Sequence, residues 1–209
     1  MSSAAQPTDK ARSSNTRRTL ESALDLIAAD ARSGVTFVGG FPASGKSTAS
    51  IYLASAIDAI VIDKDAFAAS LEESVMTELT GDPYDRDSDM YARIVKPHIY
   101  QAVIHQALLI SQRVPVIVDA PLIGHIRSAA RQRTPLADHL TATAVPAALS
   151  VRTIWISAHP NQIRQRMTRR GEPRDTARLS DWHTYCSEVL DSGVEADART
   201  VVDYVIRND

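Results

Sequence analysis

Cysteine is almost absent from this chain, since Cys186 is the single one among 209 residues. One cysteine cannot form an internal disulfide, so nothing in the sequence indicates a disulfide-stabilised secreted domain. The histidines show no metal-ligand spacing with this thiol, and a structural zinc site is therefore unsupported.

Long apolar runs and an excess of charge are also lacking. No stretch approaches the roughly 20 apolar residues that a bilayer crossing needs. Arg17-Arg18 resembles a twin-arginine export signal, but Glu21, Asp25 and Asp30 interrupt the next segment, which has the pattern of an amphipathic helix. A formal charge of −2 gives no global argument for nucleic-acid or acidic-membrane binding. We therefore expect a soluble, cytoplasmic protein, and the sequence makes no prediction about its oligomeric state.

The residues that are present predict one α/β domain. Hydrophobic residues make up 44% of the chain, enough for one sizeable core. Residues 1–16 are small and polar, which predicts a disordered tail before a single domain over 17–209. Short apolar runs alternate with helical spacing, which predicts a three-layer sandwich with a mostly parallel five-stranded sheet. We expect strands over 35–40, 59–63, 114–120, 151–157 and 199–206, and helices over 17–32, 47–57, 66–79, 89–113 (kinked or broken at Pro97), 161–170 and 177–190.

The stretch GGFPASGKST, residues 39–48, lies between the first expected strand and a helix. Its pattern Gly40-x4-Gly45-Lys46-Ser47 is the phosphate-binding loop of P-loop NTPases. Glycines let successive backbone N–H groups face phosphate oxygens, and the following helix begins with its positive dipole end there. Lys46 can reach the β and γ phosphates, and the Ser47 hydroxyl can ligate Mg²⁺. We expect an ATP site with Mg²⁺, formed by Gly40, Ala43, Ser44, Gly45, Lys46, Ser47 and Thr48.

Carboxylates follow two of the expected strands. The second strand runs into IDKDAF, where Asp65 can take the proton of an attacking hydroxyl, with Asp63 as the alternate. Asp65 could equally cap the helix that follows it, and both roles are compatible. The third strand ends at Asp119, which can hold the metal ion or simply begin a loop.

Six arginines fall between residues 164 and 178. Arg166 and Arg170 are four residues apart, so they share one face of a helix, and Gly171 would let the chain leave that helix into a mobile flap. Guanidinium groups match phosphate oxygens and stabilise charge on a transferring phosphoryl group. A solvated basic helix end is the competing interpretation of the same cluster.

Taken together, these motifs resemble the small P-loop kinases that include zeta toxins, chloramphenicol phosphotransferase, gluconate-kinase-like enzymes and the kinase domain of polynucleotide kinase. The resemblance spans about residues 35–185 and rests on the order and spacing of the motifs. It implies that Asp65 is the catalytic base. It also implies that RMTRRG, residues 166–171, opens an arginine-rich lid over about 166–182, from which Arg166 and Arg170 grip the ATP phosphates.

Departures from that family narrow the expected acceptor. Polynucleotide kinases carry an arginine three residues after the base and a threonine after the third-strand aspartate, whereas this chain has Ala68 and Ala120. Both differences, together with the modest net charge, argue against a nucleic-acid substrate. Ala43 stands where many relatives carry glycine, which is tolerable if its backbone keeps a negative φ.

We therefore expect an ATP- and Mg²⁺-dependent kinase acting on a small-molecule hydroxyl, such as that of an antibiotic, a sugar or a nucleotide-sugar. The acceptor pocket should lie between the helix after Asp65, residues 81–100 and the loop after Asp119. Candidate contacts there are Tyr84, Asp85, Arg86, Asp87, Tyr91, His98, His125 and Arg127. The alternatives are an ATP-binding regulatory switch without an acceptor, a toxin acting on a nucleotide-sugar, and a polynucleotide 5′-hydroxyl kinase.

Overall fold

The structure is a computed structural model that describes residues 9–142 and 149–209. Its centre is a five-stranded sheet in the order β2-β3-β1-β4-β5, and every neighbouring pair of strands is parallel. The strands are β1 (Val35–Gly40), β2 (Ile60–Asp63), β3 (Val116–Asp119), β4 (Val151–Ser157) and β5 (Tyr204–Arg207). The predicted α/β fold with a mostly parallel five-stranded sheet is thus confirmed, and the sheet is parallel throughout.

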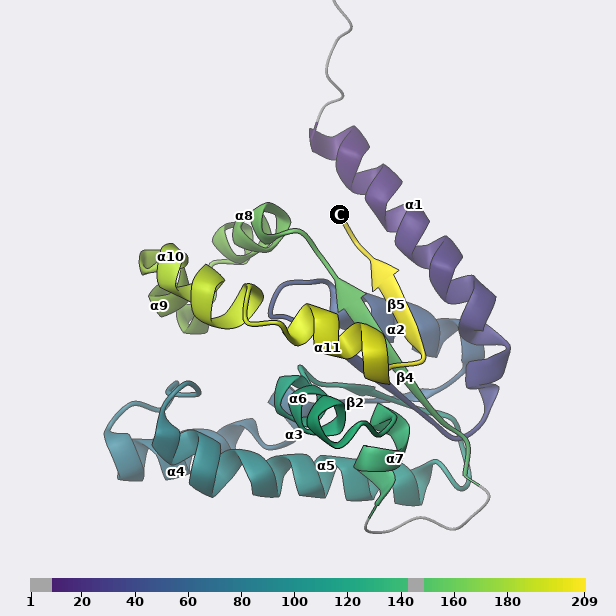
Figure 1. The fold of residues 1–209 in the computed structure, drawn as a ribbon, viewed down its shortest axis with the longest axis horizontal. Helices are drawn as coiled ribbons and strands as arrows, with labels where there is room; N and C mark the ends of the chain where they lie inside the picture. Colours follow the sequence, from purple (N-terminus) through teal and green to yellow (C-terminus); the bar gives the residue numbers. More distant parts are fainter. Residues whose placement is uncertain (1–8, 143–148) are drawn as a thin grey trace, which may run out of the picture.

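Helices cover both faces of this sheet (Figure 1). Because side chains alternate along a strand, Phe37 and Trp155 pack on one face while Val38 and Ile154 pack on the other. The second face is closed by α1 (Asp9–Ala28) and α2 (Lys46–Ile57). The first is covered mainly by α5 (Lys96–Ile110), α6 (Ile123–Gln132), α7 (Leu136–Thr141), α8 (Pro160–Arg170) and α11 (Val194–Val201).

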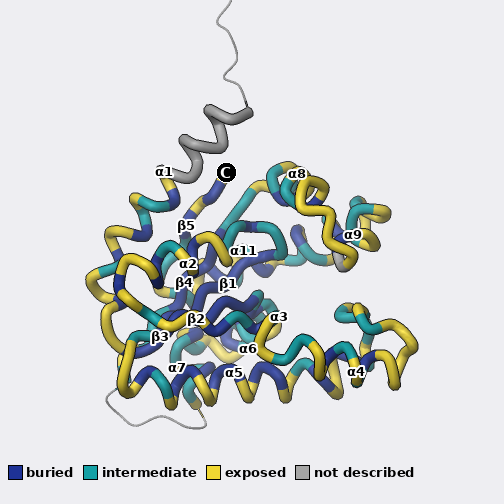
Figure 2. Tube along the Cα trace, turned by 180° about the vertical axis from the view of Figure 1, so that it is seen from behind, coloured by how far each residue is buried: buried dark blue, intermediate teal, exposed yellow. Residues whose placement is uncertain are grey.

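Two exposed arms extend beyond the same end of the buried sheet (Figures 1 and 2). One holds α3 (Lys64–Phe67), α4 (Ala69–Thr80) and a π-helical turn over Tyr91–Val95 that leads into α5. The other continues from α8 through a 3₁₀ turn (Pro173–Asp175), α9 (Thr176–Ser180), α10 (Trp182–Tyr185) and a π-helical turn (Cys186–Leu190). None of the helices in the described ranges is long and apolar enough to cross a membrane.

Several element boundaries differ from the sequence-based expectation. Helix α1 begins at Asp9 instead of Arg17, so residues 9–16 are helical, and the rest of the expected tail, residues 1–8, lies outside the described residues. The expected helix over 66–79 is split at Ala68, whose φ of −139° is not helical. Pro97 occupies the first turn of α5, where its missing N–H costs no helical hydrogen bond.

The expected helix over 177–190 is also divided, and three helices were not predicted. The division lies at Asp181, which has a φ of −120° and accepts a hydrogen bond from the Thr184 N–H. Helices α6 and α7 follow β3, and α11 occupies part of the segment that was expected to be a strand, so β5 starts only at Tyr204. Helices α6 and α11 begin without a side-chain cap, so the usual start signal is missing from their sequences.

Candidate active site

A cavity of about 530 Å³ opens at the carboxyl edge of the sheet. The phosphate loop (residues 40–48), α3, the start of α5 and the lid segment after α8 all contribute to its wall. In open parallel sheets this edge is where ligands bind, because loops from several strands meet there. The volume is in the range of small-molecule sites.

The phosphate loop has no space for side chains at its two pattern glycines. A Cβ at Gly40 would stand 2.4 Å from the Ser44 Oγ and 2.7 Å from the Ile156 carbonyl oxygen. At Gly45, with a φ of +100°, a Cβ would stand 2.0 Å from the Asn208 Nδ2. The condition under which alanine would be tolerated here, a negative φ, is not met, since the φ of Ala43 is +61°. Ala43 therefore holds a left-handed conformation that favours glycine.

The outer side of the phosphate loop is held by residues from far along the chain. The Ser44 carbonyl oxygen accepts hydrogen bonds from the Arg166 Nη1 at 2.9 Å and the Asn208 Nδ2 at 2.8 Å. Arg166 also donates from Nη2 to the Asn208 carbonyl oxygen at 2.6 Å. Arg166 is thus placed behind the loop backbone and is not among the residues that line the cavity. Arg170, on the same helix, does line it.

Lys46, Ser47 and Asp119 form the part of the site expected to hold phosphates and metal. The Lys46 Nζ lies 3.8 Å from the Asp119 Oδ1. Asp119 is 4% exposed, and among the described residues its Oδ1 has no hydrogen-bond partner. Burial raises the pKa of the Asp119 carboxyl, although Lys46 and a hydrogen bond from Ser47 act in the opposite direction.

This arrangement fits a magnesium ion. A buried carboxylate oxygen without a hydrogen bond, next to the Ser47 hydroxyl, supplies the hard oxygen ligands that Mg²⁺ prefers. The described residues contain no group of three or more His, Cys, Asp or Glu side chains arranged as a metal site. Mg²⁺ bound with nucleotide phosphates needs few protein ligands, because phosphates and waters complete its shell.

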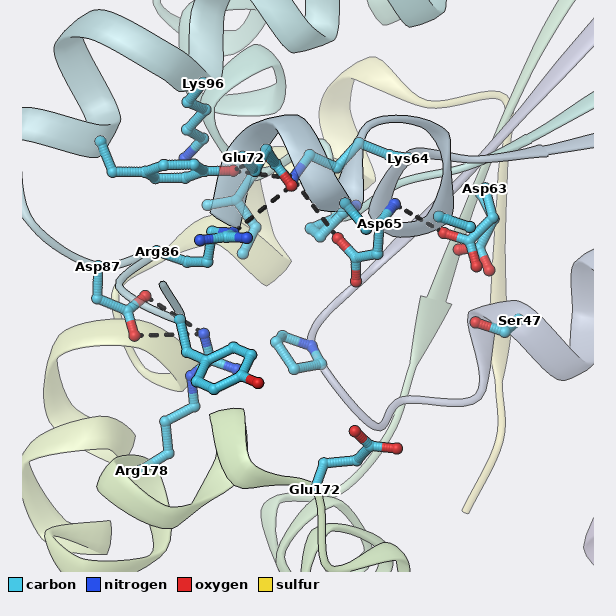
Figure 3. Close-up of a pocket in the computed structure, with 18 of the residues that line it drawn as sticks. Ser47, Asp63, Lys64, Asp65, Glu72, Arg86, Asp87, Lys96, Glu172 and Arg178 are labelled. Carbon is cyan, nitrogen blue, oxygen red and sulfur yellow. Dashed lines mark hydrogen bonds and ion pairs between the residues drawn. The ribbon is translucent and has the colours of Figure 1, made fainter. Parts of the chain in front are cut away.

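Asp63 and Asp65 have distinct positions. Asp63 pairs with Asp119 in the β2–β3 ladder, and its Oδ1 accepts a hydrogen bond from the Asp65 N–H at 2.8 Å. It is Asp63, therefore, that caps the N-terminus of α3, a role that the sequence had left open for Asp65. The Asp65 side chain is 42% exposed and lines the cavity, and Figure 3 shows its carboxylate pointing into that space.

A buried charge network supports the cavity wall beside Asp65 (Figure 3). The Lys64 Nζ donates to the Glu72 Oε1 and to the Tyr91 hydroxyl, both at 2.8 Å, and lies 3.5 Å from the Asp65 Oδ1. The Tyr91 hydroxyl donates to the same Glu72 oxygen at 2.7 Å, while the Arg86 Nε lies 3.5 Å from the Glu72 Oε2. Burial, followed by Glu72, raises the pKa of Tyr91. The sequence analysis had not singled out Lys64 or Glu72.

The lid segment is tied down by another buried carboxylate. Arg170 donates from Nε and Nη2 to the two carboxylate oxygens of Asp175, at 2.5 and 2.7 Å. This hydrogen bonding raises the pKa of Arg170. Arg178 lies 3.8 Å from Asp175 and 3.3 Å from Asp87, so it links the lid to the opposite wall. The helix α8 ends at Gly171 with a φ of +63°, as its sequence predicted.

The candidate acceptor contacts divide between two cavities. Tyr84, Arg86, Asp87 and Tyr91 line the main cavity, whereas Asp85 and Arg127 do not. His98 and His125, expected in the acceptor pocket, instead line a second cavity of about 660 Å³ on the other side of α5. Helical phase explains the position of His98, since residues four apart share a face and Lys96 and Tyr100 occupy the face of α5 toward the main cavity.

Thr48 lies outside the cavity, whereas several residues of the expected lid reach it. Thr48 is exposed in the first turn of α2 and is not among the residues that line the cavity. From the lid, Arg170, Glu172, Pro173 and Arg178 reach the cavity. The site thus brings together Lys46, Ser47, Asp65, Asp119 and Arg170, and it places Arg166 behind the loop.

Several solved structures have some similarity to this chain. A shikimate kinase from Bacteroides thetaiotaomicron has a TM-score of 0.50 at 10% identity, over 84% of this chain and 86% of that one. A gluconokinase from Sinorhizobium meliloti 1021 has a TM-score of 0.43 at 20% identity, over 84% and 82%. TT1252 from Thermus thermophilus has a TM-score of 0.42 at 22% identity, over 85% and 89%. No curated protein matched the sequence.

A family model described as an AAA domain matches residues 35–201, which extend from β1 to the end of α11. That range includes the phosphate loop, both strand-end aspartates and the lid. The chain belongs to this AAA domain family of P-loop proteins.

Proposed function

We propose that this chain is an ATP- and Mg²⁺-dependent kinase that transfers the γ-phosphate to a hydroxyl group of a small molecule. The observation that carries the proposal is the position of Asp65. Its side chain lines the same cavity as Lys46 and Arg170, while Asp63 is engaged as a helix cap. A binding protein that only senses ATP has no need of a half-exposed carboxylate in that position.

The phosphate loop supplies the binding side of the reaction. Backbone N–H groups at the start of α2 and the Lys46 ammonium hold the β and γ phosphates. Ser47 and Asp119 would hold Mg²⁺, which neutralises charge on the phosphates when it is bound. Arg166 acts indirectly in this scheme, because its hydrogen bonds to the loop carbonyls fix the shape of the cradle.

Asp65 and Arg170 supply the chemistry. The acceptor oxygen forms a bond to the γ-phosphorus as the bond to the β–γ bridging oxygen breaks, and ADP leaves with that oxygen. Asp65 orients the hydroxyl and takes its proton, while Arg170 stabilises the charge that develops on the phosphoryl oxygens. Lys64 holds Asp65 in place, because its ammonium is itself anchored on the buried Glu72.

A small acceptor is favoured by the cavity and by the sequence. The cavity wall carries both signs of charge, with Glu72, Asp87 and Glu172 beside the cations, unlike the basic groove of a strand-binding protein. The order of the motifs resembles that of small P-loop kinases, and the fold is shared with a shikimate kinase. These similarities support the class of reaction and leave the acceptor to be identified by experiment.

The test is γ-phosphate transfer from ATP with Mg²⁺ to a panel of antibiotics, sugars, nucleosides, UDP-sugars and a 5′-hydroxyl oligonucleotide. We expect transfer to one small-molecule class, reduced about 10²–10⁴-fold in Asp65→Asn with ATP affinity unchanged. Asp58→Asn is the matched control, because Asp58 is exposed at the end of α2 with a φ of +56° that asparagine tolerates. Tight ATP binding without transfer to any acceptor would favour a regulatory switch instead.

A further inference from the structure

The cations of the main cavity differ in whether they have a partner. Lys64 and Arg86 share Glu72, Arg170 holds Asp175, and Arg178 lies against Asp87. Lys46 faces Asp119 at the phosphate loop. Lys96 is the exception: among the residues whose side chains the structure describes (19–142, 149–173 and 175–209), no carboxylate forms an ion pair with it and no acceptor receives a hydrogen bond from it.

The surroundings of Lys96 disfavour the charged form of its side chain. The side chain is half-buried in the first turn of α5, one helical turn before Tyr100. Burial lowers the pKa of the Lys96 ammonium, and the positive charges of Lys64 and Arg127 lower it further, against a single opposing effect from Asp87. A cation in such a position is stabilised by any anion that enters the cavity.

The position of Lys96 relative to Asp65 indicates which part of a ligand it would meet. In Figure 3, Ser47 lies on one side of Asp65, whereas Lys96 lies on the other, beyond Glu72. The phosphate-donor end of the cavity is the Ser47 side. A molecule with its hydroxyl at Asp65 therefore extends its remaining atoms toward Lys96.

We propose that Lys96 binds an anionic group of the acceptor, so that the substrate class is hydroxylated carboxylates or phosphates and not neutral or cationic compounds. The proposal rests on the kinase function proposed above and adds the charge of the acceptor. Arg86 is a weaker candidate for this contact, since its Nη1 donates to the carbonyl oxygens of Pro83 and Asp85 and its Nε faces Glu72.

The test uses acceptors in matched pairs that differ in one charged group. Glycerate is compared with glycerol, glucuronate with glucose, and uridine 5′-monophosphate with uridine, so that carboxylate and phosphate are distinguished. We expect transfer to an anionic member and about 10–100-fold less transfer to its neutral counterpart, as for loss of a charge-assisted hydrogen bond.

The variants then assign the preference to Lys96. Lys96→Met should raise KM for the anionic acceptor about 10–100-fold with little change in kcat, and Lys96→Arg should restore most of the affinity. Arg93→Met is the matched control, because Arg93 is exposed just before Lys96 and does not line the cavity. Equal use of neutral and anionic acceptors, or the same KM in Lys96→Met, would overturn the proposal while leaving the kinase function intact.

A binding measurement decides the question if no member of the panel is phosphorylated, the result that counts against the kinase function. With the phosphate loop filled by a non-hydrolysable ATP analogue and Mg²⁺, inorganic phosphate and glycerate are titrated at constant ionic strength. Stabilisation of the wild type by either anion, lost in Lys96→Met and kept in Arg93→Met, supports the anion site. The same response in all three proteins overturns it.

Discussion

The two sides of the cavity stabilise charge by different means. On the phosphate-loop side, one contiguous segment uses backbone geometry and a helix start, and its outer carbonyls are held by Arg166 and Asn208. On the side of Asp65, which we propose receives the acceptor and call the acceptor side, Lys64, Glu72 and Tyr91 form buried side-chain contacts between segments up to 27 residues apart. Backbone groups on the first side can contact phosphates, which all nucleoside triphosphates share. The second side presents a particular set of charged side chains. Recognition of the acceptor is therefore expected to reside in side chains, where single substitutions change it.

The largest expected effect is that of removing Arg170, the lid arginine that lines the cavity. Arg170→Ala should reduce turnover by about 10³–10⁵, the range for arginines that stabilise a transferring phosphoryl group, because Arg166 lies behind the loop and Arg178 lies against Asp87. Folding stability should change far less, by about 1–3 kcal/mol from loss of the bonds to the Asp175 carboxylate. Single-turnover transfer and urea unfolding measure the two quantities.

The double variant Arg170→Ala, Asp175→Asn serves as the control for stability. It removes the carboxylate that the single variant leaves buried, so stability should partly recover while transfer stays low. Transfer at the wild-type rate in Arg170→Ala would show that the arginine has no part in the reaction.

The free energy of unfolding should be most sensitive to the loss of one charge on the acceptor side. Lys64→Met leaves Glu72, which is 1% exposed, without its shortest cationic contact, and breaking such a pair costs about 3–5 kcal/mol. Chemical denaturation measures the free energy of unfolding. The double variant Lys64→Met, Glu72→Gln should recover part of the lost stability, because it also removes the buried carboxylate that Lys64 neutralises. A cost below about 1 kcal/mol for Lys64→Met would contradict the network's stabilising role.

The phosphate-loop side should respond to Arg166 in nucleotide affinity. Arg166→Ala removes donors from the carbonyl oxygens of Ser44 and Asn208, which should weaken ATP binding about tenfold and lower stability by about 1–3 kcal/mol. Calorimetric titration with ATP measures the affinity. Arg169→Ala, an exposed neighbour on α8, is the control. If Arg166→Ala lost turnover at saturating ATP as severely as Arg170→Ala, the distinction between the two arginines would be wrong.

The smallest effects concern the left-handed backbone at Ala43. Ala43→Gly relieves a conformational cost of about 1 kcal/mol but adds freedom to the unfolded chain, so a gain of at most about 0.5 kcal/mol is expected. Ala43→Val places a β-branched side chain at the same positive φ and should destabilise the protein by about 1–2 kcal/mol. Thermal unfolding of the two variants measures the sign of each change in stability. A loss of stability in Ala43→Gly together with a gain in Ala43→Val would refute strain at Ala43.

The features that the sequence predicted are those encoded by neighbouring residues. The phosphate loop is one such motif, and Asp63, Asp65 and Asp119 were found because carboxyl ends of parallel strands meet at one edge. Helix α8 and its Gly171 cap were equally local. Such signals need no knowledge of how distant segments pack.

The features that the sequence did not predict depend on tertiary contacts. Arg166 and Arg170 share a helix face, yet Arg166 contacts Asn208, 42 positions away in sequence, whereas Arg170 contacts Asp175, five positions away. Helical spacing alone gave them the same role. Similarly, nothing in the sequence distinguishes Lys64 and Glu72 from other charged residues. The fold brings them into contact in a buried position, where Glu72 also accepts a hydrogen bond from Tyr91.

The contact between Ser44 and Asn208 also has a consequence for synthesis on the ribosome. The two residues are 164 positions apart in sequence, so the loop emerges long before the side chain that supports its backbone. A nascent chain shorter than 208 residues lacks this contact, together with the Arg166 bond to the Asn208 carbonyl oxygen. ATP is therefore expected to bind weakly to nascent chains until Asn208 has been synthesised and can reach the loop.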